Sequence, residues 1–249
     1  MVLTAAKGAL GFLTRLPTGR TERAWTAFSR TPAAFPLAGW VVGALAASPF
    51  LAAALVPALP APTVAVGYLL ALYGITGINH ADGVADLGDA AVIHGDQADR
   101  RAVVKDTEVG VGAALALGLV FAGLALAALS LAGLPALAAV AIVAAAEVGA
   151  KLGMAALACL GEPAFEGLGS AFTDNRPADL LAALAVAAPV VLLGVHAVGA
   201  LLGGVAVAVA LLSWADRNLG GINGDVFGAA NELGRVVGLH LGVIAWTLS

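Results

Sequence analysis

Val109-Gly-Val-Gly-Ala-Ala-Leu-Ala-Leu-Gly-Leu-Val-Phe-Ala-Gly-Leu-Ala-Leu-Ala-Ala-Leu-Ser-Leu-Ala132 is an apolar run without a charged side chain. At about 1.5 Å per residue, a helix of this length reaches across a hydrocarbon core of about 30 Å. In lipid, every backbone polar group must find its partner within the protein, and a helix satisfies this condition by itself. The run therefore predicts a transmembrane α-helix.

Similar runs recur along the chain, and hydrophobic residues make up 61% of the 249 residues while charged residues make up 11%. The mean hydropathy is +0.97, and a soluble domain with about a quarter of its residues charged could not hide so much apolar surface. We therefore predict an all-α, polytopic transmembrane helical bundle of about seven spans, which forms a single integral membrane domain over residues 1–249. The predicted spans are Phe35–Ala58, Thr63–Ile78, Val109–Ala132, Leu134–Leu160, Leu180–Val198, Gly199–Trp214 and Val226–Leu248.

Basic residues lie in connections that alternate with uncharged turns near residues 57–62, 133–135 and 198–204. Because Lys and Arg favour the cytoplasmic side, the N-terminus is expected in the cytoplasm and the C-terminus outside. Residues 1–31 are then an interfacial segment, and residues 79–108 a cytoplasmic acidic catalytic loop. The basic residues of these connections are Arg15, Arg20, Arg23, Arg30, Arg100, Arg101, Lys105, Arg176 and Arg217.

Three aspartates, Asp82, Asp86 and Asp89, follow the second predicted span at positions i, i+4 and i+7. At 100° per residue, their carboxylates fall within about 60° on one helical face, where the charges repel. A divalent cation, a shared proton or basic neighbours could offset this repulsion. Because all-oxygen ligands suit Mg²⁺ or Mn²⁺, the three aspartates are candidate metal ligands; the alternative is a solvated polar loop.

Small and polar residues flank the aspartates. His80 is a candidate proton carrier, Asn79 contributes an amide, and Gly83 leaves room for a phosphate to approach closely. Such neighbours are typical of a site that binds a phosphorylated substrate beside a metal ion.

A second cluster begins at Lys105, whose ammonium could meet a phosphate as a point charge. Asp106 could complete a metal site or orient Lys105, and the N–H of Gly110 at the start of a helix could bind an anion. The alternative is a helix cap with one snorkelling lysine.

The third cluster opens the last predicted span. Asp225 and Glu232 share a helical face, Gly228 leaves a slot between them, and Asn223 and Arg235 flank the pair. Carboxylates that enter a membrane beside small residues indicate a functional site, although a purely structural Glu232–Arg235 pair would also explain them.

Glu147 and Lys151 form an i, i+4 pair inside the fourth predicted span. The pair could clamp the bundle or belong to the catalytic wall, and both readings stay open.

The three clusters together resemble the cobalamin synthase family, the adenosylcobinamide-GDP ribazoletransferases. The resemblance covers nearly the whole chain, including Gly11-Phe-Leu-Thr-Arg-Leu-Pro17. Gly77-Ile-Asn79 departs from the pattern, which has paired glycines there. The motifs that carry the resemblance are His80-x-Asp82-Gly83-x-x-Asp86-x-x-Asp89, Lys105-Asp106-x-x-x-Gly110-x-Gly112 and Gly224-Asp225-x-x-Gly228-Ala229-x-x-Glu232.

The resemblance implies a Mg²⁺-dependent transferase that joins α-ribazole, or its 5′-phosphate, to adenosylcobinamide-GDP and releases GMP, a late step of cobalamin (vitamin B12) biosynthesis. The expected setting is the inner or plasma membrane in contact with lipid, with the active site on the cytoplasmic face. No nucleic acid is expected, and a homo-oligomer is left open. The expected metal ligands are Asp82, Asp86, Asp89 and Asp225; the catalytic residues are His80, Asp82, Lys105 and Glu232; and the substrate-binding residues are Asn79, Gly83, Asp106, Gly110, Asn223, Gly228 and Arg235.

Two other functions match parts of this pattern. A CDP-alcohol phosphotransferase also places an Asp-Gly motif on membrane helices, but its motif continues differently from Asp82-Gly83-x-x-Asp86. An ion-coupled transporter needs a path open to both sides of the membrane, whereas the acidic residues here gather at one side.

Overall fold

The computed structural model describes residues 2–18, 20–106, 108–167 and 169–249. In this part of the chain the regular secondary structure is helical, with one isolated β-bridge between Pro163 and Ile222. The α-helices are α1 (Val2–Leu13), α2 (Glu22–Ser29), α3 (Ala34–Ala46), α4 (Ser48–Leu55), α5 (Ala61–Thr76), α6 (Asn79–Val92), α7 (Gln97–Val104), α8 (Val111–Leu131), α9 (Ala136–Leu160), α10 (Leu180–Ala187), α11 (Val195–Asn218) and α12 (Gly224–Thr247). The 3₁₀ helices are η1 (Ser170–Phe172), η2 (Pro177–Asp179) and η3 (Ala188–Leu193).

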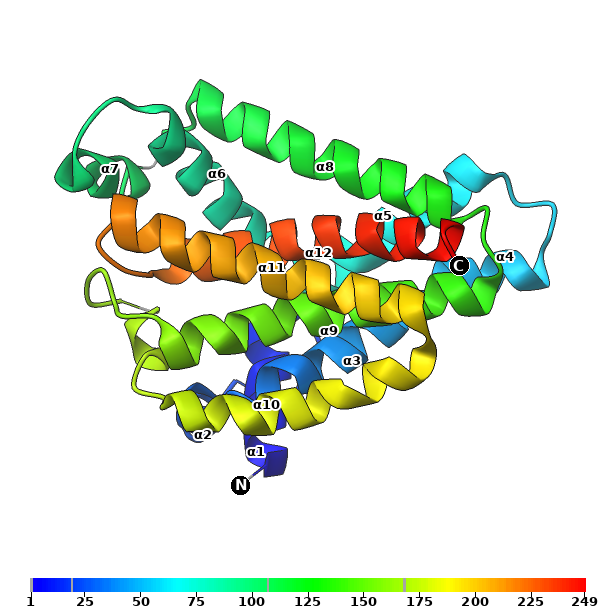
Figure 1. Ribbon diagram of the computed structural model, residues 1–249, viewed down its shortest axis with the longest axis horizontal. Helices are drawn as coiled ribbons and strands as arrows, with labels where there is room; N and C mark the ends of the chain where they lie inside the picture. The colour runs from blue at the N-terminus through cyan, green and yellow to red at the C-terminus, as the bar shows by residue number, and fades with distance from the viewer. Residues whose placement is uncertain (1, 19, 107, 168) are drawn as a thin grey trace.

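Helix α9 forms the centre of the bundle and packs against α3, α11 and α12 (Figure 1). Small residues permit these helices to approach closely. A Cβ atom added at Gly39 of α3 would lie 2.8 Å from the Cα of Val148, and one added at Gly238 of α12 would lie 2.7 Å from the carbonyl oxygen of Ala200. These contacts are of the kind that membrane helices make through small residues.

Among the described residues, four segments are long and apolar enough to cross a membrane: Ala34–Leu55, which comprises α3 and α4, together with α8, α9 and α11. Helices α5 and α6 pass the same test only as a pair, and they are bent by 97°. The bend occurs at Gly77, whose φ of 72° favours glycine. The all-α fold with several apolar spans is thus confirmed.

One predicted boundary was wrong. The turn expected between Val198 and Gly199 lies at Gly194, where φ is 105°, and α11 continues unbroken from Val195. Both sides of the turn are equally apolar, so hydropathy could not locate it, whereas the positive φ identifies the residue that reverses the chain.

The polar connections gather at one end of the bundle. In Figure 1, α7 and the turn between α11 and α12 lie at the left, whereas the connection between α8 and α9 and the C-terminus lie at the right. Residues 79–108, predicted as an acidic loop, fold largely into α6 and α7. Helix α6 and the N-terminus of α12 therefore meet near the polar end.

Candidate active site

A cavity of about 290 Å³ lies where α6 meets the start of α12. The helices approach closely because a Cβ at Gly83 would lie 2.5 Å from the carbonyl oxygen of Asp225. This contact brings Asp82 and Asp225 to the lining of one cavity, together with His80. The close approach that we predicted for a phosphate at Gly83 is thus made by another helix.

Three carboxylates are within electrostatic reach of one another at this crossing. The charges of Asp225 and Asp82 both act on Asp86, which is half-buried on α6. Asn223 caps α12 by accepting a hydrogen bond from the N–H of Val226, and its amide donates to Asp225 Oδ2 at 2.7 Å. Repulsion among these acids favours a bound cation.

Of the other residues predicted on α6 and α12, some line the cavity and one lies away from it. Asn79 and Gly228 also line the cavity, and Asn79 borders a second cavity of about 400 Å³ beside α1 and α2. In contrast, Arg235 is fully buried and lies outside the lining.

Four phenylalanines from separate segments form the apolar wall of the cavity. Phe172 lies at their centre, with ring centroids 6.2 Å from Phe12, 5.3 Å from Phe35 and 5.5 Å from Phe227. Phe12 is 39% exposed, whereas the other three are buried. Such a wall suits a planar ring, because aromatic pairs gain about 0.5–1.5 kcal/mol beyond their area burial.

Asp89 points toward α8. Its carboxylate accepts hydrogen bonds from the N–H of Gly110 at 2.7 Å and from the N–H of Ala113 at 2.9 Å, so it caps the start of that helix. The N–H of Gly110, which we predicted to bind a substrate anion, therefore already meets an anion of the chain itself.

Replacing Asp89 should accordingly reduce stability. Asp89→Ala leaves two N–H groups of α8 without their acceptor and is expected to lower the free energy of unfolding by about 0.5–2 kcal/mol. Asp89→Asn keeps one acceptor oxygen and should lose less. Denaturation in detergent, followed by circular dichroism, would measure both variants, and an Asp89→Ala variant as stable as the parent would contradict the capping role.

Lys105 and Asp106 lie at the end of α7 and are exposed, outside the cavity lining. The ammonium of Lys105 sits 4.4 Å from the ring centroid of Phe165, and Asp106 accepts a hydrogen bond from the N–H of Glu108 at 3.2 Å. Their predicted contact with substrate phosphates thus remains a prediction.

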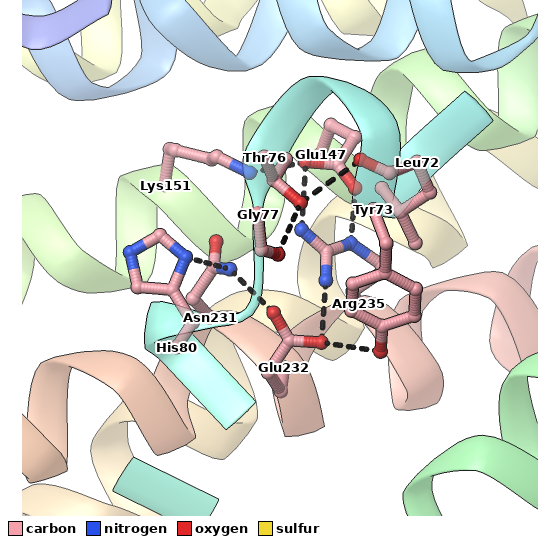
Figure 2. Close-up of polar contacts among 10 residues, drawn as sticks. All are labelled: Leu72, Tyr73, Thr76, Gly77, His80, Glu147, Lys151, Asn231, Glu232 and Arg235. Carbon is pink, nitrogen blue, oxygen red and sulfur yellow. Dashed lines mark hydrogen bonds and ion pairs between the residues drawn. The ribbon is translucent and has the colours of Figure 1, made fainter. Parts of the chain in front are cut away.

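Behind the cavity, four charged side chains form a buried ladder, defined by Lys151, Glu147, Arg235 and Glu232 (Figure 2). Glu147 accepts from both Lys151 and Arg235, and Arg235 Nη1 lies 2.7 Å from Glu232 Oε2. All four side chains are at most 1% exposed. Two acids and two bases give the ladder no net charge, which makes its burial tolerable.

The ladder continues to the cavity through uncharged groups. Glu232 accepts hydrogen bonds from the hydroxyl of Tyr73 at 3.2 Å and from the amide of Asn231 at 3.1 Å. The same amide nitrogen of Asn231 lies 3.0 Å from Nδ1 of His80. Both oxygens of Glu232 are thus engaged, and the Glu232–Arg235 pair is present as the structural alternative described.

The donor set of the cavity fits Mg²⁺. Within the described residues, no group of three or more His, Cys, Asp or Glu side chains is arranged to hold a metal ion. However, Mg²⁺ is commonly held by one or two carboxylates, with substrate phosphates and water completing its coordination. Asp82 and Asp225 supply such oxygens, Asp86 lies nearby, and Asp89 is already engaged with α8.

Comparison with known proteins identifies the family. The sequence model of a family described as cobalamin-5-phosphate synthase matches residues 5–243. The chain belongs to this family. It is 51% identical to an adenosylcobinamide-GDP ribazoletransferase of Halorubrum lacusprofundi, with 99% of each chain covered, and 43% identical to that of Haloquadratum walsbyi, with 100% of each covered. The corresponding protein of Methanococcoides burtonii is 30% identical, over 98% of this chain and 93% of its own. No solved structure shows significant similarity.

In this member of the cobalamin-5-phosphate synthase family, sequence reasoning missed several residues at the site. Asn231 and Tyr73 were given no role, although each contacts Glu232. A polar Asn231 beside an acid in an apolar segment was a usable signal. The phenylalanine wall left no such signal, because its members come from four separate segments of the chain.

Proposed function

We propose that this chain is an adenosylcobinamide-GDP ribazoletransferase, which joins α-ribazole, or its 5′-phosphate, to adenosylcobinamide-GDP with release of GMP in cobalamin biosynthesis. Family membership over residues 5–243 carries this proposal. The cavity supports it, since clustered carboxylates beside an aromatic wall suit a phosphate group and a planar base.

In the proposed reaction, a ribose hydroxyl oxygen of α-ribazole attacks the phosphorus that carries cobinamide. The new P–O bond forms as the bond to the phosphate of GMP breaks. The hydroxyl proton passes to a carboxylate that faces the cavity, Asp82 or Asp225, because Glu232 is enclosed by its partners. The chain thus contributes orientation and a proton acceptor, as phosphoryl transfer requires.

Asp82, Asp225 and Asp86 would hold Mg²⁺ together with the diphosphate. Asp89 would support this site indirectly, by fixing the start of α8 against α6. When bound, Mg²⁺ neutralises charge on the diphosphate and on the leaving GMP. Lys105 and Asp106 would meet the part of the nucleotide that extends beyond the cavity.

Removal of the metal should abolish the reaction. Protein purified in detergent is expected to form GMP and a cobalamin from adenosylcobinamide-GDP, α-ribazole and Mg²⁺, to stop when EDTA is added in excess, and to recover when Mg²⁺ is restored. Chromatography of both products is the measurement. Release of GMP unaffected by EDTA would overturn the metal assignment.

The same assay tests the rival functions. If CDP-diacylglycerol replaced adenosylcobinamide-GDP as donor, the CDP-alcohol phosphotransferase reading would hold instead. Uptake of a solute into sealed vesicles that contain the protein, without release of GMP, would favour a transporter.

We also propose that the chain crosses the inner or plasma membrane about seven times, with the N-terminus and the cavity on the cytoplasmic side. The arginine-bearing connections and the uncharged turns at opposite ends of the bundle support this topology (Figure 1). Helices α5, α10 with η3, and α12 would supply the spans beyond the four apolar segments.

A further inference from the structure

We infer that Asn231 holds His80 in the tautomer that carries its proton on Nε2, so that His80 acts at the cavity as a hydrogen-bond donor to phosphate and not as the general base. The inference rests on the proposed function and concerns the same cavity. It follows from the donors and acceptors around a single amide group (Figure 2).

The orientation of the Asn231 amide is fixed by Glu232. The carboxylate of Glu232 is ion-paired with Arg235 and also accepts from the hydroxyl of Tyr73. Only the –NH₂ side of an amide can donate to such an oxygen, and the group 3.1 Å from Glu232 Oε1 is therefore Asn231 Nδ2. The reverse orientation would place two oxygens against each other.

The second hydrogen of the same –NH₂ group points to His80. Asn231 Nδ2 lies 3.0 Å from Nδ1 of the imidazole, and an –NH₂ group has no lone pair with which to accept. Nδ1 must therefore accept, and the single proton of the neutral ring resides on Nε2. Asn231 is fully buried, so water does not compete for this contact.

The other ring nitrogen of His80, Nε2, is available for a contact in the cavity. Nε2 forms no hydrogen bond with any other described residue, and His80 lines the cavity together with Asp82 and Asp225. An N–H group at this place can donate to a non-bridging phosphate oxygen or to the leaving phosphate of GMP, where negative charge grows during transfer. A general base would instead need an unprotonated Nε2.

The buried ladder keeps the arrangement rigid. Glu232 is held by Arg235, which is held in turn by Glu147 of α9, so the orientation of Asn231 is fixed from the centre of the bundle. Asn231 is accordingly a positioning residue, and His80 is the group that contacts substrate.

Matched replacements of His80 separate a donor from a base. The amide of glutamine can place an N–H near the position of Nε2, whereas alanine removes the group and asparagine is too short to reach the cavity. We expect kcat to fall about 10²–10³-fold in His80→Ala and His80→Asn, as after loss of one donor to a developing charge. His80→Gln should retain at least about ten times the kcat of His80→Ala, because an amide can donate but cannot act as a base.

A ratio below about ten between the Gln and Ala variants, both folded by circular dichroism, would overturn the inference. The tautomer itself can be measured by long-range ¹⁵N–¹H NMR of ¹⁵N-histidine-labelled protein in detergent. Because the chain has only four histidines, the spectrum is simple, and the signals that disappear in His80→Gln are those of His80. A protonated Nδ1 in the unmodified protein would equally refute it. Asn231→Leu should give mixed tautomers, which a merely structural role would not produce.

The NMR result does not depend on the reaction. If the unmodified protein released no GMP from adenosylcobinamide-GDP and α-ribazole, the proposed function would fail while the tautomer could still be read. Active protein with the other tautomer would refute only the role assigned to His80.

Discussion

Asp82→Asn is expected to lower the rate of GMP release by about 10³-fold or more while the protein still folds and inserts into membranes. Asp82 is exposed to the cavity and faces Asp225 across the crossing of α6 and α12. The amide keeps the shape of the side chain but loses the charge that a metal ion and a proton would both need. Single-turnover release of GMP, measured at saturating Mg²⁺, is the appropriate assay.

Asp216→Asn provides the matched control. Asp216 lies on α11, is exposed, and contacts Gln97 only through its backbone carbonyl, so the same chemical change outside the cavity should leave the rate unaltered. Asp225→Asn should behave like Asp82→Asn. Full activity in Asp82→Asn would remove this aspartate from the active site.

Glu147→Gln should have the largest effect on stability, with a loss of about 3–5 kcal/mol in the free energy of unfolding. The carboxylate of Glu147 is completely buried and is the acceptor shared by Lys151 and Arg235. Its neutralisation would leave two cations facing an amide, with Glu232 as the one anion of the ladder. Unfolding in mixed micelles of increasing SDS content would measure the loss.

A double replacement distinguishes charge balance from packing. Glu147→Gln combined with Lys151→Met removes one acid and one base, and leaves the Arg235–Glu232 pair neutral. We therefore expect the double variant to be more stable than Glu147→Gln alone. Its loss in the free energy of unfolding should be smaller than the sum of the losses in the two single variants. If the losses simply added, the charge balance of the ladder would not be the source of its stability.

Much of the fold could be predicted from the chain itself. A helix in lipid must satisfy the hydrogen bonds of its own backbone, and in the sequence it is recognised as an uninterrupted apolar run. The bounds of α8 and α9 lie within two residues of the predicted Val109–Ala132 and Leu134–Leu160. The reversal at Gly194 was missed because it separates two equally apolar helices and depends on one backbone angle. The 97° bend between α5 and α6 likewise depends on a backbone angle, the φ of 72° at Gly77, which hydropathy does not register.

For the candidate site, the sequence indicates which residue types take part but not how they are arranged in space. Asp82 and Asp225 were identified from charge at the ends of apolar runs, and the structure places both at one cavity. Periodicity also placed Asp89 on the same face as Asp82. However, the start of α8 approaches that side of α6, and its N–H groups donate hydrogen bonds to the carboxylate of Asp89. Which partner a side chain meets is decided by tertiary contacts between distant segments, and helical spacing alone cannot supply them.

The pairing within the ladder also bears on how the protein is made. Glu147 and Lys151 are one turn apart on α9, and Glu232 and Arg235 are one turn apart on α12. Each helix therefore carries its own counter-ion, so α9 can enter the bilayer without net charge in its apolar length before α12 has been synthesised. Within the ladder, only the ion pair between Arg235 and Glu147 joins the two helices, so it forms only when α12 packs against α9.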